Sequence, residues 1–177
     1  MENNYSNIKI LIVEDDDSQL FVIEETLKRL GFATHGVQLG SEAIDYYREN
    51  PDSILLLDYN LPDLNGIDII DTLRQEGYSV DFITMTAYGN EHVAVTMMKL
   101  GARDYIVKDT NFVSFLPSVV KNTVNRILTE KRLIASEETL RQVKQKYYEL
   151  FEHSKDAVYL SDTEGNILTC NQSMLDM

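Results

Sequence analysis

Short apolar runs alternate with amphipathic stretches along the first two thirds of the chain. Between the runs, apolar residues recur at the spacing of a helix face, as at Leu20, Ile23 and Leu27. Strands that are apolar throughout and separated by helices are typical of parallel βαβ units covered on both faces. The pattern therefore predicts an α/β fold built from five such units. Their strands are expected at residues 8–13, 33–37, 53–58, 81–86 and 103–108.

Local signals predict where two of the intervening helices begin and end. Gly31 stands where the first helix should end, and Ser41 is placed to cap the start of the second. Asp16 and Asp17 follow the first apolar run, where acidic residues commonly cap and stabilise the next helix.

The pattern changes near residue 118. Sequence that favours a helix continues from about residue 114 to 151, and no Gly or Pro interrupts residues 118–150. Two partial apolar seams with a phase shift predict a short parallel coiled coil, and hence a homodimer through this helix. The alternative is a single amphipathic helix packed on its own chain. The first seam is Val120, Ile127 and Ile134, and the second is Leu133, Leu140, Val143, Tyr147 and Leu150.

A hairpin is predicted in the last 27 residues. The alternating segments AVYLSD and ILTCN flank the Gly-containing turn TEGN. About 30 residues are too few to bury a core of their own. We therefore expect residues 151–177 to be the truncated start of a further domain.

Charge and composition narrow the function classes. The 177 residues carry a formal charge of −13, and their hydrophobic and charged fractions, 44% and 25%, are ordinary for a globular protein. This acidic balance argues against nucleic acid as a partner, and no apolar run is long enough to span a membrane. The single cysteine, Cys170, suits a reducing compartment. We expect a cytoplasmic protein without direct membrane contact.

Polar side chains with complementary chemistry follow four of the predicted strands. Glu14 and Asp15 follow the first, Asp58 ends the third, Thr86 the fourth and Lys108 the fifth. Each has an ordinary explanation as a cap, a packing residue or a surface charge. Together, at the carboxyl edge of a parallel sheet, the carboxylates would repel one another unless a cation such as Mg²⁺ lay between them. Such a site binds a phosphoryl group, with Asp58 as a nucleophile.

These residues resemble the response-regulator receiver domain of two-component signalling. The resemblance rests on VEDD, DYNLPDLNG, MTA and GARDYIVK, at residues 13–16, 58–66, 85–87 and 101–108. It implies a doubly wound, flavodoxin-like sheet of order 2-1-3-4-5 over residues 1–128, with an extended C-terminal helix. It also implies that a histidine kinase or phosphotransfer protein donates the phosphoryl group.

The resemblance assigns roles position by position. Asp58 would accept the phosphoryl group, Thr86 and Lys108 would contact it, and Tyr105 would change rotamer as Thr86 moves. The Mg²⁺ ligands would be Glu14, Asp15, Asp58 and the backbone carbonyl of Asn60.

Two more positions near the site differ from what a typical receiver would have or could affect its chemistry. Asp109 departs from the family pattern, and Tyr88 bears on the lifetime of the phosphoryl group. Asp109 stands where receivers usually have a proline, often with a cis bond, so an extra carboxylate is expected near the site. Tyr88 is bulky enough to limit attack by water, although an ordinary loop aromatic is equally plausible.

The resemblance extends to the C-terminal segment, which is similar to the opening of a PAS sensor domain, with residues 129–150 as a helical linker. This order is typical of hybrid sensor kinases and multidomain regulators, although we expect no output enzyme in these residues. Two alternatives remain: an interaction module that is independent of phosphorylation, and an Asp-nucleophile phosphatase of the haloacid dehalogenase type. The second lacks its Asp-x-Asp motif, because Asn60 stands at the second position.

Overall fold

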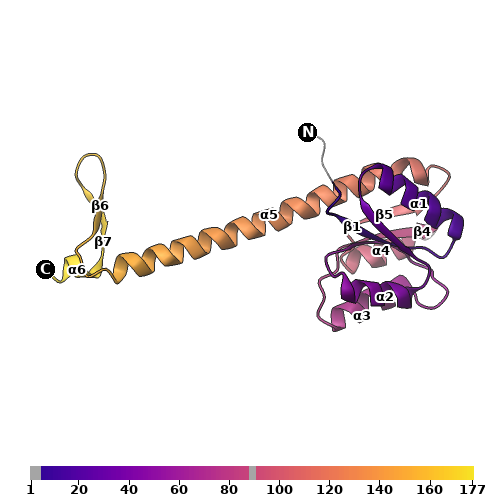
Figure 1. Ribbon diagram of the computed structural model, residues 1–177, viewed down its shortest axis with the longest axis horizontal. Coiled ribbons are helices and arrows are strands. Elements are labelled where there is room, and N and C mark those ends of the chain that lie inside the picture. Colours follow the sequence, from indigo (N-terminus) through magenta and orange to yellow (C-terminus); the bar gives the residue numbers. More distant parts are fainter. Residues whose placement is uncertain (1–4, 88–90) are drawn as a thin grey trace. The chain divides into compact units, whose positions relative to one another are not determined.

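The computed structural model describes residues 5–87 and 91–177, which divide into two compact units, residues 1–127 and 128–177. The first unit is built on a five-stranded parallel sheet of order β2-β1-β3-β4-β5 (Figure 1). This is the predicted doubly wound, flavodoxin-like arrangement. The strands are β1 (Lys9–Val13), β2 (Ala33–Val37), β3 (Ile54–Asp58), β4 (Phe82–Ala87) and β5 (Asp104–Lys108).

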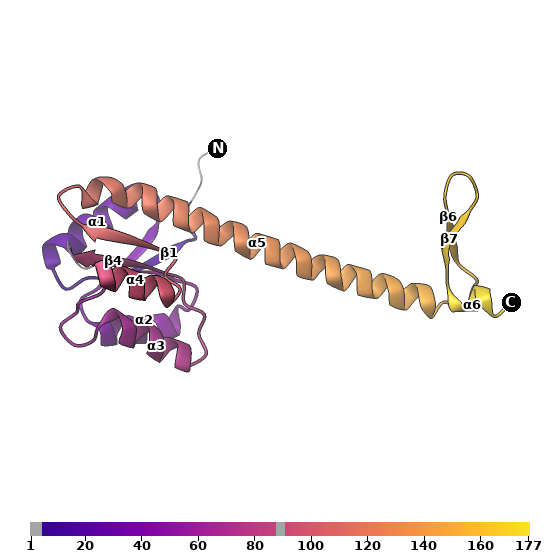
Figure 2. The ribbon, with the colours of Figure 1, turned by 180° about the vertical axis from the view of Figure 1, so that it is seen from behind.

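Helices cover both faces of this sheet (Figure 2). Alternate strand residues point to opposite faces, so Leu55 and Leu57 pack in one apolar core with residues from α2, α3 and α4. Leu56 is also fully buried, as expected for a central strand covered on both sides. The helices are α1 (Asp17–Arg29), α2 (Gly40–Glu49), α3 (Gly66–Gln75), α4 (Glu91–Lys99) and α5 (Phe112–Glu152).

The ends of α1 agree with the sequence. Asp16 is the N-cap and accepts a hydrogen bond from the backbone N–H of Gln19 at 2.8 Å. Gly31 follows the helix with a φ of 88°, a conformation that glycine adopts without strain.

The prediction that Ser41 caps α2 is wrong. The helix begins at Gly40, and its N-cap, Leu39, has no side chain that can accept a hydrogen bond. The carboxylate of Asp63, from the loop after β3, accepts hydrogen bonds from the backbone N–H groups of Gly40 and Ser41 instead. The capping group is supplied from 22 residues away, so the local sequence could not reveal it.

The long helix predicted near the C-terminus is present as α5, which spans 41 residues. Leu116, Val120, Val124 and Ile127 are buried in the first unit, with at most 1% of each exposed. The first predicted seam is therefore not continuous, because Val120 and Ile127 belong to this core whereas Ile134 is 65% exposed.

The second unit contains the end of α5 and the predicted hairpin. Strands β6 (Tyr159–Ser161) and β7 (Ile167–Cys170) pair antiparallel, and the short helix α6 (Gln172–Leu175) follows. Asn171 is fully buried, and its side chain accepts hydrogen bonds from the backbone N–H groups of Val158 and Met174. Across the described helices, none is both long and apolar enough to cross a membrane.

Candidate functional site

The predicted site residues gather at the carboxyl edge of the sheet. Val13 of β1 pairs with Leu57 of β3, so the residues that follow them, Glu14 and Asp58, are neighbours. On the other side, Asp58 pairs with Met85 of β4, and Ala87 pairs with Lys108 of β5. The parallel register alone therefore places all of these positions on one edge.

Lys108 joins two of the carboxylates. Its Nζ lies 2.5 Å from Oε2 of Glu14 and also donates a hydrogen bond to Oδ2 of Asp58. The side chains of Glu14 and Asp58 are only 1% and 11% exposed. One ammonium group thus lies between two nearly buried acids, an arrangement that a packing or surface role does not require.

Burial and pairing perturb the ionisation of this cluster. Burial raises the pKa of Glu14, and this effect outweighs the opposing influence of the Lys108 ammonium. Burial alone would lower the pKa of Lys108, but hydrogen bonds to Asp58 and Glu14 raise it overall. Lys108 therefore remains charged at neutral pH.

The donor set fits a divalent cation. Carboxylate oxygens of Glu14, Asp15 and Asp58 lie within 4.8 Å of one another. Both Glu14 oxygens are buried, and Oε2 lies beside the Lys108 ammonium. Mg²⁺ prefers oxygen ligands such as these carboxylates. It usually binds through one or two of them and keeps several water ligands.

Two further predicted residues, Thr86 and Asn60, lie on the same edge, whereas Tyr105 lies near the start of β5. Thr86 of β4 is 2% exposed and pairs with Val107, next to Lys108. Tyr105 of β5 pairs with Thr84 and is 46% exposed. Asn60 lies two residues beyond Asp58, and its N–H donates to Oδ1 of Asp58 at 3.3 Å.

Sequence comparisons identify relatives of this chain. The family model described as the response regulator receiver domain matches residues 10–119. The chemotaxis protein CheY1 of Helicobacter pylori is 32% identical over 129 residues, which are 68% of this chain and 97% of that protein. A CheY homolog of Campylobacter jejuni is 33% identical, over 68% of this chain and 92% of its own length. The chain belongs to the response-regulator receiver family.

Solved structures of receiver domains have the same fold as this chain. The signal receiver domain of a putative Luxo repressor protein from Vibrio parahaemolyticus superposes with a TM-score of 0.65 at 27% identity, covering 71% of this chain and 96% of that one. A putative response regulator from Chloroflexus aurantiacus gives 0.61 at 27% identity, covering 67% and 98%. Receiver domains take phosphoryl groups from histidine kinases or phosphotransfer proteins, and they generally bind Mg²⁺ in an acidic pocket.

Asp109, which stands where receivers usually have a proline, has a local structural role. The Lys108–Asp109 bond is trans, and the exposed Asp109 carboxylate accepts a hydrogen bond from the N–H of Asn111 at 2.8 Å. The expected extra carboxylate is thus turned to the start of α5 and is not part of the acidic cluster. Tyr88 lies outside the described residues, so its effect on the phosphoryl lifetime stays a prediction.

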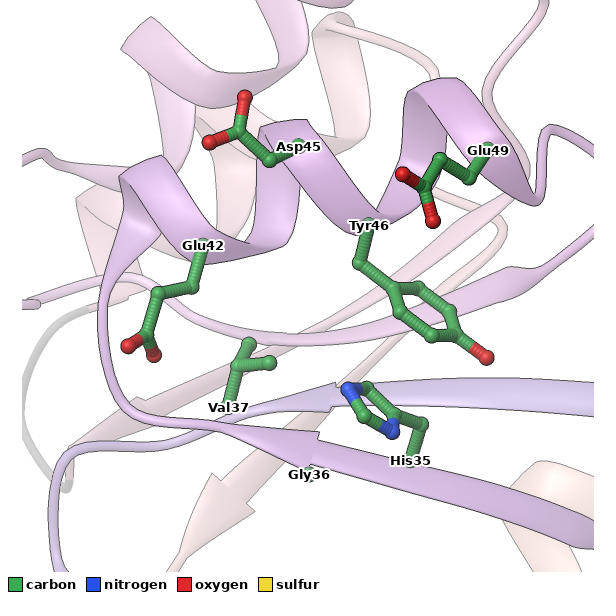
Figure 3. A pocket seen from close by; sticks show the side chains of 7 residues that line it. All are labelled: His35, Gly36, Val37, Glu42, Asp45, Tyr46 and Glu49. Atoms are coloured by element: carbon green, nitrogen blue, oxygen red, sulfur yellow. The ribbon is translucent and has the colours of Figure 1, made fainter.

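A hollow lies at the edge of the sheet between β2 and α2 (Figure 3). The ring of His35 stacks on Tyr46 with centroids 4.0 Å apart, and Glu42 and Glu49 lie nearby. Asp45 points away from the histidine and pairs with Arg48. Because these acids do not converge, among the described residues the acidic cluster that suits a metal is the one at the carboxyl edge.

One residue of the loop after β3 was missed by the sequence reasoning. The sequence pattern places Asp63 only within the motif at residues 58–66, whereas in the structure its carboxylate joins this loop to α2. The available signal was the apolar residue at the N-cap of α2, Leu39, which leaves the helix start in need of an acceptor.

Proposed function

We propose that Asp58 accepts a phosphoryl group from a histidine kinase or phosphotransfer protein in a Mg²⁺-dependent reaction. The observation that carries this proposal is the convergence of three carboxylates on the open carboxyl edge, with Lys108 between two of them. Glu14, Asp15, Asp58 and the backbone carbonyl of Asn60 would hold the ion. When bound, Mg²⁺ would neutralise charge on the transferring phosphoryl oxygens.

The protein's own residues supply the nucleophile and the surrounding charges. A carboxylate oxygen of Asp58 attacks phosphorus, the bond from phosphorus to the donor's imidazole nitrogen breaks, and an acyl phosphate forms. The Asn60 N–H and Lys108 hold the Asp58 carboxylate in one orientation before attack. Lys108 and the Thr86 hydroxyl then contact the new phosphoryl oxygens, because phosphoryl transfer needs mainly positioning and charge neutralisation.

The switch is proposed to pass through Thr86 and Tyr105. A hydrogen bond from Thr86 to the phosphoryl group would draw this side chain inward and vacate space for the Tyr105 ring. Since β5 leads directly into α5, the change would be relayed along that helix.

A labelling experiment tests phosphoryl acceptance. The chain is incubated with Mg²⁺ and acetyl phosphate, and the mass of the intact protein is measured beside Asp58→Asn and the matched control Asp71→Asn, an exposed acid on α3. We expect one phosphoryl adduct in the native chain and in the control, and none in Asp58→Asn. A native chain without an adduct would instead favour a phosphorylation-independent module.

The C-terminal part of α5 is proposed to form a homodimer. Leu133, Leu140, Val143 and Leu150 recur at spacings of three and seven residues, and each is at least 59% exposed. The described residues of one chain leave this seam uncovered, and a second copy offers a stripe of the same spacing.

The flanking charges favour a parallel pair in one register. With Leu133, Leu140 and Tyr147 at core position a, Arg132 takes position g and Glu137 takes position e. In a parallel dimer, a residue at position g of one helix faces the residue at position e of the partner helix that is five residues further along. Arg132 would therefore pair with Glu137 of the partner subunit, and the dimer would contain two such pairs.

Oligomeric mass tests the dimer. Sedimentation of the full chain should show a dimer, and Leu140→Asp should raise its dissociation constant at least about tenfold, since a charge would be buried in the seam. Gln145→Asp, which adds the same charge at an outward position, should leave it unchanged. Arg132→Glu should weaken the dimer, and adding Glu137→Arg should restore it. A native chain that stays monomeric would remove this proposal.

The domain assignment completes the proposal. Residues 1–128 form the receiver, 129–150 a coiled-coil linker and 151–177 the opening of a PAS domain, as in hybrid sensor kinases and regulators. The antiparallel hairpin β6–β7 supports this, because Tyr159, Leu160, Ile167 and Leu168 are each at least 48% exposed and suit burial under further strands.

A further inference from the structure

The start of α2 is capped by a group from another part of the chain. Oδ1 of Asp63 accepts from the Gly40 N–H at 2.8 Å and from the Leu64 N–H at 2.9 Å, while Oδ2 accepts from the Ser41 N–H at 2.9 Å. Both oxygens are therefore occupied, and one carboxylate satisfies two of the orphan N–H groups at the helix end. Burial would raise the pKa of Asp63, but the backbone hydrogen bonds lower it to about 2.

The loop and the helix start are packed closely at this point. A Cβ atom added to Gly40 would lie 2.9 Å from Cβ of Leu64 and 2.9 Å from Cδ1 of Ile69. Gly40 therefore allows the loop backbone to approach, and the Asp63 hydrogen bonds hold it there. Together they form a tether between α2 and the loop, which we call the Asp63 tether.

The same loop carries the residue next to the acidic cluster. The N–H of Gly66 donates to the carbonyl of Tyr59 at 2.9 Å, and Asn60 forms an antiparallel bridge with Asn65. Asn65 in turn caps α3 by accepting from the N–H of Ile67 at 2.9 Å. Asn60 is thus held at one end by Asp58 and at the other by a loop whose tip is fixed by Asp63.

We propose that Asp63 is a positioning residue for the phosphorylation site, which holds the Asn60 carbonyl in place through the loop. This inference rests on the proposed function, in which that carbonyl is a Mg²⁺ ligand. Asp63 itself touches neither the ion nor the phosphoryl group. Without the Asp63 carboxylate, Asn60 would be less ordered in the metal-free protein. Part of the binding free energy would then be spent on ordering it, so the affinity for Mg²⁺ would fall.

A simple helix cap is the competing explanation, and the chain offers a way to separate the two. Leu39 is the N-cap of α2 and has the extended backbone that a capping aspartate needs, with φ −118° and ψ 144°. Asp63→Ala removes the tether and the cap. Asp63→Ala with Leu39→Asp returns a cap and the original charge, but not the tether. Leu39→Asp alone is the matched control.

Three measurements are made on the native chain and these variants: thermal stability without metal, Mg²⁺ affinity from amide chemical shifts in a titration with MgCl₂, and hydrogen exchange at Asn60 and Leu64 without metal. We expect Asp63→Ala to lose stability, to bind Mg²⁺ roughly tenfold more weakly and to exchange faster at both amides. In the double variant, stability should return while the Mg²⁺ affinity and the exchange rates stay changed.

The outcomes are distinguishable. Unchanged Mg²⁺ affinity in Asp63→Ala, or an affinity that returns with Leu39→Asp, would overturn the tether and leave a cap alone. A native chain that binds no Mg²⁺ would refute the proposed function. Hydrogen exchange would then test the Asp63 tether by itself. If Asp63→Ala left the exchange rate of the Asn60 amide unchanged, the tether would be overturned.

Discussion

The two halves of α5 have the same apolar periodicity but different surroundings. In the first half, Leu116 and Val120 are fully buried in the first unit. In the second half, Leu140 and Leu150 are 68% and 78% exposed. Periodicity therefore establishes that a helix has an apolar stripe, whereas what covers the stripe is decided by tertiary structure or by a partner.

The largest expected effect is a difference in unfolding free energy between two leucine-to-alanine variants, one in each half of α5. Leu116→Ala should cost about 2–5 kcal/mol of unfolding free energy, because it opens a cavity in a closely packed core. Leu140→Ala, the same substitution on the same helix, should stay within about 0.5 kcal/mol at concentrations where the chain is monomeric. Urea denaturation of both variants checks this. Equal losses would mean that the second half packs on its own chain.

A smaller effect is expected at the buried amide of the second unit. Asn171→Ala should cost about 1–3 kcal/mol of local stability, because the backbone N–H groups of Val158 and Met174 lose their acceptor. Hydrogen exchange should accelerate in β6 and β7 and stay unchanged in β1 and β3. Acceleration in β1 or β3 as well would contradict the division of the chain into two units.

The sequence predicted the sheet well because its central strands are continuous apolar runs, and β3 is buried at every position. It also predicted that Asp58 and Lys108 lie close together, since the carboxyl ends of parallel strands share one edge. It failed at Ser41, where the capping group comes from Asp63, and at Val120 and Ile127, where spacing alone could not separate a core from an oligomer seam. Each failure concerns a contact between residues far apart in the chain or a choice between possible partners.

The smallest expected effect is on stability at low pH. Each unit contains a carboxylate that accepts backbone hydrogen bonds, Asp63 in the first and Asp162 in the second. Asp63 joins segments more than 20 residues apart, whereas Asp162 accepts hydrogen bonds from the N–H groups of Glu164 and Asn166 in its own turn. In both, hydrogen bonds to the ionised form lower the pKa, for Asp63 from 3.8 to about 2 against the opposing effect of burial. Such stability is present above the unfolded-state pKa and is lost as the pH falls through the folded-state value.

The native receiver should accordingly exceed Asp63→Asn in stability at neutral pH by a few tenths to about 1 kcal/mol, because the site is exposed and lies at a helix N-terminus. This difference should shrink as the pH falls from about 4 towards 2. Urea denaturation of both proteins at a series of pH values measures it, with Asp162→Asn as the control that should leave unfolding of the first unit unchanged at every pH. A difference that stays constant across this range would mean that the charge of Asp63 contributes nothing and that its hydrogen bonds to α2 act through shape alone.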